Sequence, residues 1–314
     1  MLSCYKDINK RLLNEKYNLR DISAYRGTFG VTVRDSGIYI SPTFKAVLSP
    51  EKFNLNCEGL CKTATPLFIE ETYANFAKVI GTNIKGYVSV NDIAIISKST
   101  AKLLLTHQRK LKVTGAFAVT NPSACHQLSK VVLSYGTSLP FYPCYNKPYF
   151  EVLLPFRNKN GVAVWKKAEI LKSQNVHIGN LKFTRKIFLN TALSVLGTPY
   201  DWGGSFGSYD CSSLISTTFS LFGIIFPRNS YDIGKLKGIF IKNPEKDFDK
   251  CVAGDILYMK GHVMIYAGKY GNNHYIYHSF YGNKRADITS INVLTSKGKP
   301  LKEVIEKIIP LNFL

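Results

Sequence analysis

The stretch Leu196-Gly-Thr-Pro-Tyr-Asp-Trp-Gly-Gly-Ser-Phe-Gly-Ser-Tyr-Asp-Cys-Ser-Ser-Leu is a glycine-rich, aromatic loop that leads directly into a helical pattern. Hydrophobic residues recur at helical spacing from Cys211 to Phe222, and Gly223 follows where a helix C-cap is expected. The pattern predicts a helix that begins at Cys211. The unpaired backbone N–H groups and the positive end of the helix dipole then lie at the Cys211 thiol.

This position suggests a chemical role for Cys211. A helix N-terminus lowers the pKa of a thiol, so the sequence predicts a partial thiolate near neutral pH and a nucleophilic side chain. The competing interpretation is that Cys211 is one more small, buried hydrophobic residue, which is the commoner role of an isolated cysteine. A proton-transferring partner is needed to choose between the two.

Three of the six histidines lie in strand-like segments downstream of Cys211, and two of them, His262 and His278, fall on adjacent segments. His262 opens the run His262-Val-Met-Ile-Tyr after a Lys-Gly turn, and His278 shares one strand face with His274 and Ile276. We expect His262 to take and return the proton, and His278 to hold the other ring nitrogen of His262. The alternative for each histidine is a purely structural role.

The surrounding segments predict an α+β domain over residues 184–314. Thr184 is placed to cap a helix that ends near Gly197, because Gly197 and Pro199 both terminate helices. Helices therefore come first and strands follow, an order typical of a helix layer against an antiparallel sheet. The expected strands span residues 254–259, 262–268 and 274–279.

Residues 1–175 have a different pattern. Residues 1–28 predict a short helical N-terminal segment, with Ile8, Leu12 and Leu13 at helical spacing. Residues 29–98 and 99–175 each contain short β-type runs broken by turn residues, which predict two small barrels. Four parts are expected in all, at residues 1–28, 29–98, 99–175 and 184–314.

The charge balance points to an anionic partner. The 314 residues carry a formal net charge of +20, which favours attraction to an anionic cell wall, an acidic membrane surface or a nucleic acid. The abundant lysine, asparagine, isoleucine and tyrosine also fit the codon bias of an AT-rich genome. No zinc-finger spacing, RNA-binding aromatic signature or basic heptad helix is present, so we expect no nucleic acid partner.

Cysteine usage and hydropathy exclude further classes. The seven cysteines are an odd number, so at least one thiol is unpaired in a monomer. Cys57 and Cys61 are spaced like a metal pair, but no second pair follows, and we expect neither a metal nor a cofactor. No segment approaches the ~20 apolar residues of a membrane helix, and we expect no transmembrane segment. If the given chain is a mature form whose signal has been removed, the expected location is the bacterial cell envelope. If the chain is complete as given, the expected location is the cytoplasm.

Four segments, in order, resemble the NlpC-type cysteine peptidases of bacterial cell walls. The resemblance covers about residues 184–280, and the two β-rich stretches resemble the bacterial SH3-like domains that often precede this peptidase domain. The four segments are Leu196-Gly-Thr-Pro-Tyr-Asp-Trp-Gly-Gly, Tyr209-Asp-Cys-Ser-Ser-Leu, Phe222-Gly-Ile-Ile-Phe-Pro-Arg-Asn-Ser, and Gly254-Asp-Ile-Leu with Gly261-His-Val-Met-Ile-Tyr-Ala-Gly.

The resemblance implies a papain-like core in which Cys211 attacks, His262 is the base and a polar third residue orients the base. Family members often place the third residue where His274 lies, but the context Ile276-Tyr-His-Ser favours His278. The resemblance also implies that Tyr200 helps to bind the oxyanion and that three further residues contact the substrate. Loop packing, a helix-terminal acid and a turn are the structural alternatives for these positions. The predicted substrate-binding residues are Trp202, Asp210 and Ser230.

These expectations combine into one function. We expect hydrolysis of peptidoglycan stem peptides or muropeptides at the bond between γ-D-glutamate and the diamino acid, through an acyl-thioester on Cys211. One alternative keeps the site but makes the protein an amidase or acyltransferase. A second alternative is a wall-binding module with a dormant site, in which the SH3-like domains are the functional part.

Overall fold

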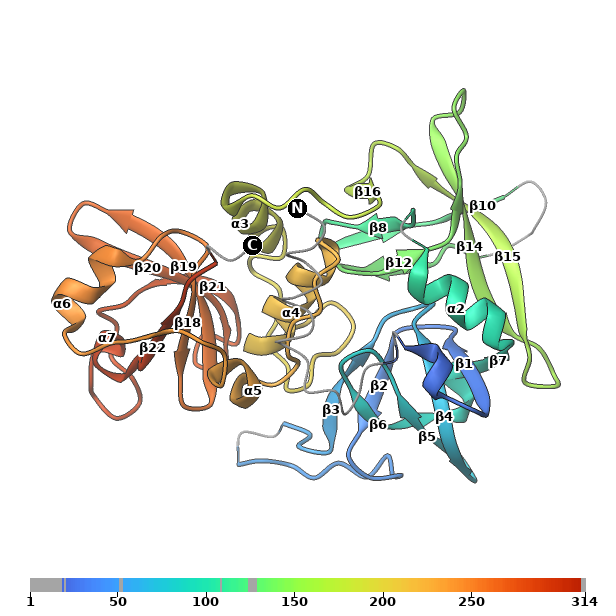
Figure 1. Ribbon diagram of the computed structural model, residues 1–314, viewed down its shortest axis with the longest axis horizontal. Helices are drawn as coiled ribbons and strands as arrows, with labels where there is room; N and C mark the ends of the chain where they lie inside the picture. The colour runs from blue at the N-terminus through green and yellow to red at the C-terminus, as the bar shows by residue number, and fades with distance from the viewer. Residues whose placement is uncertain (1–18, 20, 51–52, 108, 124–128, 312–314) are drawn as a thin grey trace. The chain divides into compact units, whose positions relative to one another are not determined.

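The computed structural model describes residues 19, 21–50, 53–107, 109–123 and 129–311, and the expected helix around Leu12 lies outside this range. The chain forms two compact units. We call residues 15–181 together with 202–207 the N-terminal unit, and residues 1–14, 182–201 and 208–314 the C-terminal unit (Figure 1). None of the described helices is long and apolar enough to cross a membrane.

The first half of the N-terminal unit is a seven-stranded antiparallel sheet in the order β3-β2-β6-β5-β4-β1-β7. Its core includes Ile38, Leu67, Val79 and Val88, which lie on neighbouring strands and are all buried. The strands are β1 (Thr28–Thr32), β2 (Ser36–Tyr39), β3 (Cys57–Cys61), β4 (Pro66–Tyr73), β5 (Phe76–Ile80), β6 (Lys85–Ser89) and β7 (Ile93–Ile96), with short helical turns at Ile22–Ala24 and Val90–Asp92.

The second half of this unit contains a helix and three smaller sheets, in the orders β10-β15-β14-β13, β12-β8-β16 and β11-β9. Ser97 caps the helix by accepting a hydrogen bond from the Thr100 backbone N–H. The elements are α2 (Lys98–Thr106), β8 (Leu111–Val113), β9 (Phe117–Val119), β10 (Asn121–Pro122), β11 (Val132–Ser134), β12 (Ser138–Leu139), β13 (Phe141–Tyr142), β14 (Tyr149–Arg157), β15 (Ala163–Leu171) and β16 (Val176–Ile178).

The two halves share one hydrophobic core. Phe29 and Val31 from β1 belong to the same buried cluster as Leu111, Val152 and Ile170 from the second half. The large sheet ends in the edge strands β3 and β7, and closed barrels are not found among the described strands. The structure therefore shows a mixed helix and sheet fold rich in antiparallel strands but does not confirm two SH3-like barrels. The expected boundary at residue 98 stays a prediction.

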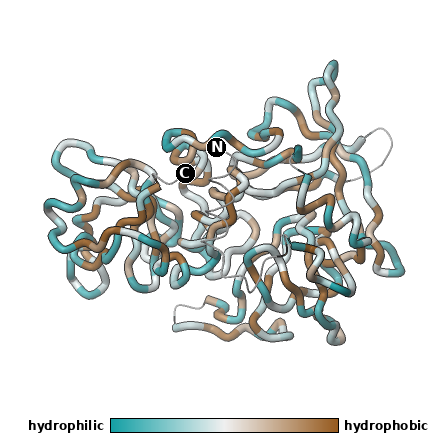
Figure 2. Tube along the Cα trace, viewed as in Figure 1, coloured by the Kyte–Doolittle hydropathy of each residue, from teal (hydrophilic) through white to brown (hydrophobic). Residues whose placement is uncertain are grey.

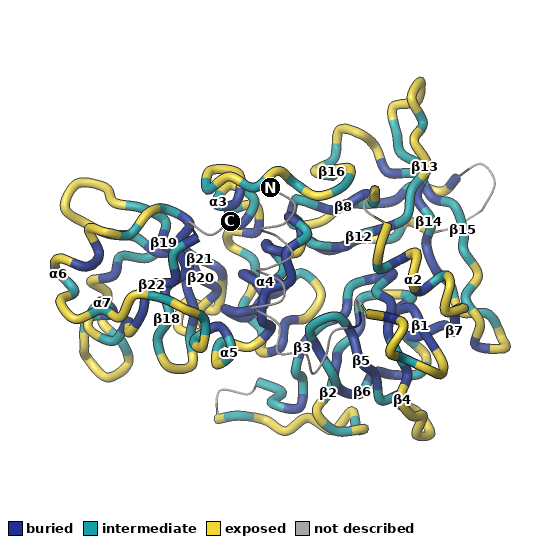
Figure 3. The backbone as a smooth tube through the Cα atoms, viewed as in Figure 1, coloured by how far each residue is buried: buried dark blue, intermediate teal, exposed yellow. Residues whose placement is uncertain are grey.

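The C-terminal unit places helices against a six-stranded antiparallel sheet in the order β17-β22-β18-β19-β20-β21 (Figure 1). Figure 3 shows that the central helix α4 is mostly buried, whereas exposed residues gather in the turns. The elements are α3 (Arg185–Leu193), α4 (Cys211–Leu221), α5 (Ser230–Gly234), β17 (Ile239–Phe240), α6 (Pro244–Asp247), a turn at Phe248–Lys250, β18 (Ile256–Met259), β19 (His262–Tyr270), β20 (Asn273–Phe280), β21 (Arg285–Ser290), α7 (Leu301–Val304) and β22 (Lys307–Ile309).

Local sequence signals explain the two helices that lie against the sheet. Thr184 caps α3 through the Ile187 N–H, as expected, and Gly223 ends α4 with a φ of 75°, a conformation that favours glycine. The helices meet through aromatic rings. Phe188 of α3 lies 4.7 Å from Phe219 of α4, measured between ring centroids, and each buried ring contributes about 2–3 kcal/mol by the hydrophobic effect.

A backbone segment before the glycine-rich loop extends the sheet past β21. Gly197 and Tyr200 donate N–H bonds to the carbonyls of Ala286 (2.8 Å) and Lys284 (2.9 Å), and Ala286 donates to the Thr198 carbonyl (2.8 Å). Hydrophobic residues concentrate on the strands of this sheet, as Figure 2 shows. The segment is therefore held like an additional strand, which fixes the backbone of Tyr200.

Candidate active site

Helix α4 begins at Cys211 because its neighbours form a capping box. The Asp210 carboxylate accepts the Ser213 N–H at 2.6 Å, and the Ser213 hydroxyl accepts the Asp210 N–H at 2.9 Å. Two of the backbone N–H donors at the start of helix α4 are thereby satisfied by side chains. Cys211 follows the cap directly, with only 7% of its surface exposed. The thiol is thus fixed at a rigid helix start.

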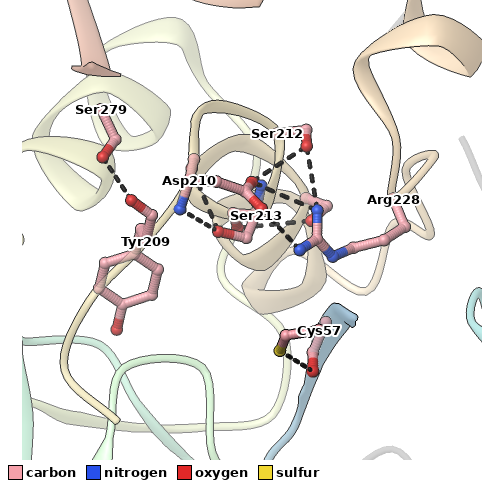
Figure 4. Close-up of polar contacts among 9 residues, drawn as sticks. Cys57, Tyr209, Asp210, Ser212, Ser213, Arg228 and Ser279 are labelled. Atoms are coloured by element: carbon pink, nitrogen blue, oxygen red, sulfur yellow. Dashed lines mark hydrogen bonds and ion pairs between the residues drawn. The ribbon is translucent and has the colours of Figure 1, made fainter. Parts of the chain in front are cut away.

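The same carboxylate forms a buried ion pair. Arg228 Nη2 lies 2.7 Å from Asp210 Oδ2, and both side chains are about 10% exposed or less. The Ser212 hydroxyl donates to Asp210 at 3.0 Å and accepts from Arg228 at 3.0 Å (Figure 4). Burial alone would raise the pKa of the Asp210 carboxyl, but Arg228 and the serine donors outweigh it and hold that pKa below its usual value. Asp210 is therefore an anion whose oxygens are already used within the protein.

The two expected histidines meet across adjacent strands. His262 begins β19 and His278 lies in β20, and the ring atoms His262 Nε2 and His278 Nδ1 are 2.8 Å apart. His274, the other residue considered for the third position, instead contacts Tyr266 Oη at 2.7 Å and Asp249 at 3.4 Å. The structure therefore joins His262 to His278, and their catalytic roles remain predictions.

Burial keeps both histidines neutral. Loss of hydration lowers the pKa of His262 to about 3, and the neighbouring His278 acts in the same direction. Burial lowers the pKa of His278 to about 4. At neutral pH each ring carries one proton, so His262 keeps one unprotonated nitrogen. Since Nε2 of His262 is engaged with His278, Nδ1 is the nitrogen left to accept a proton from elsewhere.

The electrostatics of Cys211 correct one expectation. Burial raises the pKa of the thiol to about 12, and the Asp210 carboxylate acts in the same direction. Backbone hydrogen bonds from Val263 and Ser212 lower it without offsetting the burial. The free protein therefore holds a neutral thiol, and the prediction of a partial thiolate from the helix start was wrong. The reason is burial, which the sequence pattern did not reveal.

Alkylation of Cys211 by iodoacetamide should test this protonation state, because only the thiolate reacts. We expect slow reaction at neutral pH and a rise of about tenfold per pH unit through the alkaline range, since the thiolate fraction grows by that factor below the thiol pKa. Peptide mass spectrometry of the full chain follows Cys211 separately from the other cysteines. In the variant His262→Ala, the alkylation rate of Cys211 should rise with pH by the same factor. A rate that is already constant from about pH 5 to pH 8 would instead indicate a thiolate paired with imidazolium.

The other predicted residues have distinct positions. Tyr200 is half-buried, and burial, followed by its neighbours Cys211 and Asp210, raises the pKa of its phenol, so it stays a hydrogen-bond donor. Ser230 is the half-buried first residue of α5. Trp202 is 45% exposed and groups with the N-terminal unit. The predicted contacts of these residues with substrate stay predictions.

Two residues of the site escaped the sequence analysis. Thr289 Oγ1 in β21 lies 3.1 Å from His278 Nε2, and Ser279 in β20 donates to the Tyr209 carbonyl at 2.5 Å (Figure 4). Ser279 thus ties the histidine strand to the residue before Asp210. Ser279 could have been predicted from its position next to His278. Nothing in the polar sequence of β21 indicated a role for Thr289. Among the described residues, no cluster of three or more potential metal ligands is present.

Sequence comparison identifies the family of this region. Residues 197–298 match the NlpC/P60 family. A dipeptidyl-peptidase 6 of Lysinibacillus sphaericus is 38% identical over 101 residues, which cover 32% of this chain and 34% of the relative. A gamma-D-glutamyl-L-lysine dipeptidyl-peptidase of Bacillus subtilis (strain 168) is 30% identical over 149 residues, 44% of this chain and 45% of the relative. The matches thus span less than half the length of either curated relative.

Solved structures show the same fold over most of the chain. An NlpC/P60 endopeptidase from Photobacterium damselae subsp. piscicida superposes with a TM-score of 0.69 at 18% identity, covering 92% of this chain and 71% of the other. An NlpC/P60 family protein from Bacillus cereus ATCC 10987 also gives a TM-score of 0.69 at 18% identity, covering 90% of this chain and 99% of the other. At this identity the likeness concerns the fold alone.

Proposed function

We propose that this chain, which carries an NlpC/P60 family domain over residues 197–298, is a cysteine peptidase that hydrolyses peptidoglycan stem peptides. The observation that carries the proposal is the 2.8 Å contact between His262 Nε2 and His278 Nδ1. It leaves Nδ1 of a neutral His262 as a base, in the same unit as a thiol fixed at the start of α4. A nucleophile, a base and a group that orients the base are the three parts that acyl transfer requires.

Attack begins from the neutral pair. His262 Nδ1 accepts the thiol proton while Cys211 Sγ forms a bond to the substrate carbonyl carbon, so charge develops only as the bond forms. The carbonyl oxygen becomes an oxyanion. The Cys211 backbone N–H at the helix start and the protonated phenol of Tyr200 are the proposed donors to it. His278 accepts a hydrogen bond from Nε2–H of His262 and stabilises the imidazolium.

Collapse of the tetrahedral intermediate breaks the C–N bond. The leaving amine takes the proton from His262, and the acyl group remains on Cys211 as a thioester. His262 then removes a proton from water, the resulting hydroxide adds to the thioester carbonyl, and the C–S bond breaks. The second product leaves as a carboxylate and the thiol is reprotonated, which balances the cycle without an external cofactor.

The proposed bond joins γ-D-glutamate to the diamino acid of the stem peptide. Support comes from the Bacillus subtilis relative, whose name specifies a gamma-D-glutamyl-L-lysine substrate. Asp210 is one of the residues predicted to contact the substrate. Because its oxygens already bind Ser213, Ser212 and Arg228, a substrate amine would have to share them.

We further propose that the N-terminal unit is SH3-like in function and holds the protein on the anionic wall. Its many antiparallel strands and the formal charge of +20 over the whole chain support this role. The unit supplies strand edges and exposed side chains of the kind that bind extended polymers.

Mass spectrometry of digested muropeptides tests the proposed bond. Full-length protein incubated with purified muropeptides, in which the stem peptide is still joined to muramic acid, should release one fragment ending in D-glutamate and one beginning with the diamino acid. A matched peptide with the glutamate linked through its α-carboxyl is the control, and it should stay intact because its carbonyl is displaced from the γ position. Release of intact stem peptides from muramic acid would indicate the amidase instead, and an absence of products from either substrate would favour the dormant wall-binding module.

A further inference from the structure

Three side chains from adjacent strands form a hydrogen-bonded series in the C-terminal unit. His262 lies in β19, His278 in β20 and Thr289 in β21. The strand register pairs Tyr266 with Ile276 and Ile276 with Thr289, so alternation places all three side chains on one face of the sheet. His262 Nε2 lies 2.8 Å from His278 Nδ1, and His278 Nε2 lies 3.1 Å from Thr289 Oγ1.

The direction of each hydrogen bond follows from the reaction. To accept the thiol proton, His262 needs a lone pair on Nδ1, so the single hydrogen of its neutral ring is on Nε2. That hydrogen is donated to His278 Nδ1. A neutral His278 then carries its own hydrogen on Nε2, which points at the Thr289 hydroxyl oxygen. The reverse series places a hydrogen on Nδ1 of His262 and blocks the base.

We infer that Thr289 is a positioning residue that accepts the Nε2–H of His278 and so keeps His278 in the tautomer that receives a hydrogen bond from His262. This role rests on the proposed function of the histidines. Thr289 acts through His278 and does not itself reach the reacting atoms. Thr289, on strand β21, therefore adds a third residue to the hydrogen-bonded pair of His262 and His278.

The environment of His278 makes the Thr289 hydroxyl hard to replace. His278 is 3% exposed, so water has little access to its ring. Phe280 stacks on the ring with centroids 5.1 Å apart and planes 8° apart, which fixes the direction of its Nε2–H. Without the hydroxyl, the productive tautomer would bury an N–H group that has lost its acceptor. Buried N–H groups without a partner are rarer than unpaired acceptors. The population of the reverse tautomer of His278 would therefore rise.

The test compares Thr289→Val, which keeps the shape and removes the hydroxyl, with Thr289→Ser, which keeps the hydroxyl. Long-range ¹H–¹⁵N spectra of the full-length protein report which nitrogen of each histidine carries hydrogen, with signals assigned through single His→Gln variants. We expect Nε2–H on both His262 and His278 in the wild type. In Thr289→Val, the His278 signals should move toward the Nδ1–H form and kcat should fall about tenfold at similar KM. Thr289→Ser should restore both.

Thr295→Val is the matched control. Its hydroxyl is buried and has no hydrogen-bond partner within the described part of the chain, so its loss should change neither the spectra nor kcat. An Nδ1–H form of His278 in the wild type would overturn the inference, even if Thr289→Val does not fold. Unchanged spectra and kcat in a folded Thr289→Val would also overturn it. The spectra need no substrate, so a wild type with the expected tautomers but no hydrolysis would remove the proposed function and leave the positioning role.

Discussion

Replacing Cys211 with alanine is expected to reduce hydrolysis of stem peptides by at least about 10⁴-fold, because the thioester can no longer form. The alanine fills the same helix position, so the capping box of Asp210 and Ser213 should persist. Product release measured by mass spectrometry, at matched protein concentration, gives the ratio of kcat/KM. The wild type should also show a transient mass increase equal to the acyl group, which the variant lacks.

Cys251→Ala is the control for this experiment. Cys251 is half-buried in the same unit, directly after the turn at Phe248–Lys250, and burial raises the pKa of its thiol to about 12 as well. It therefore resembles Cys211 in environment but, among the described residues, takes no part in the hydrogen-bonded series of His262, His278 and Thr289. We expect Cys251→Ala to keep most of the activity. Hydrolysis by Cys211→Ala at a rate near that of Cys251→Ala would rule out Cys211 as the nucleophile.

Replacing Arg228 with methionine is expected to cost about 3–5 kcal/mol of stability around α4. Methionine preserves much of the side-chain length, but Asp210 loses its counter-charge while it stays buried. Both tryptophans, Trp165 and Trp202, belong to the N-terminal unit, so their fluorescence would not report this change. Amide hydrogen exchange of Cys211–Leu221, followed by mass spectrometry, measures the free energy of opening directly.

The exposed pair Lys235–Asp232 supplies the comparison. Its N–O distance is 2.9 Å, close to that of the buried pair, but its side chains are 52% and 46% exposed. Lys235→Met should therefore leave the stability nearly unchanged, because water already screens the two charges. If Arg228→Met accelerated exchange no more than Lys235→Met does, the buried pair would have no special part in holding the start of α4.

The helices beside the site were the most predictable part of the fold. Thr184, Asp210 and Gly223 mark helix ends by hydrogen bonds within a few residues, and such local rules can be applied to sequence alone. The expected strand at 262–268 also lies within β19 because its hydrophobic run is short and bounded by turns. Local chemistry therefore carried the prediction in both cases.

Features that depend on distant pairing were harder to predict. Strand β21 (Arg285–Ser290) buries only Ala286, so it lacks the alternation that reveals a strand, and Thr289 was missed with it. Helix α2 (Lys98–Thr106) was not among the expected elements, and its buried residues Ala101 and Leu104 join a core shared by both halves. The protonation of Cys211 also depends on distant residues, because segments far along the chain bury it.

The backbone pairing of residues 197–200 with β21 has a consequence for behaviour in solution. A bare edge strand offers unpaired N–H and C=O groups to other chains and promotes aggregation. Here the outer edge over Lys284–Ala286 is occupied by the chain itself, through the bonds from Gly197 and Tyr200. Pro199, in the middle of this covering segment, has no N–H to offer to a further strand. The segment that leads into the nucleophile loop thus also shields this part of the β21 edge against intermolecular strand addition.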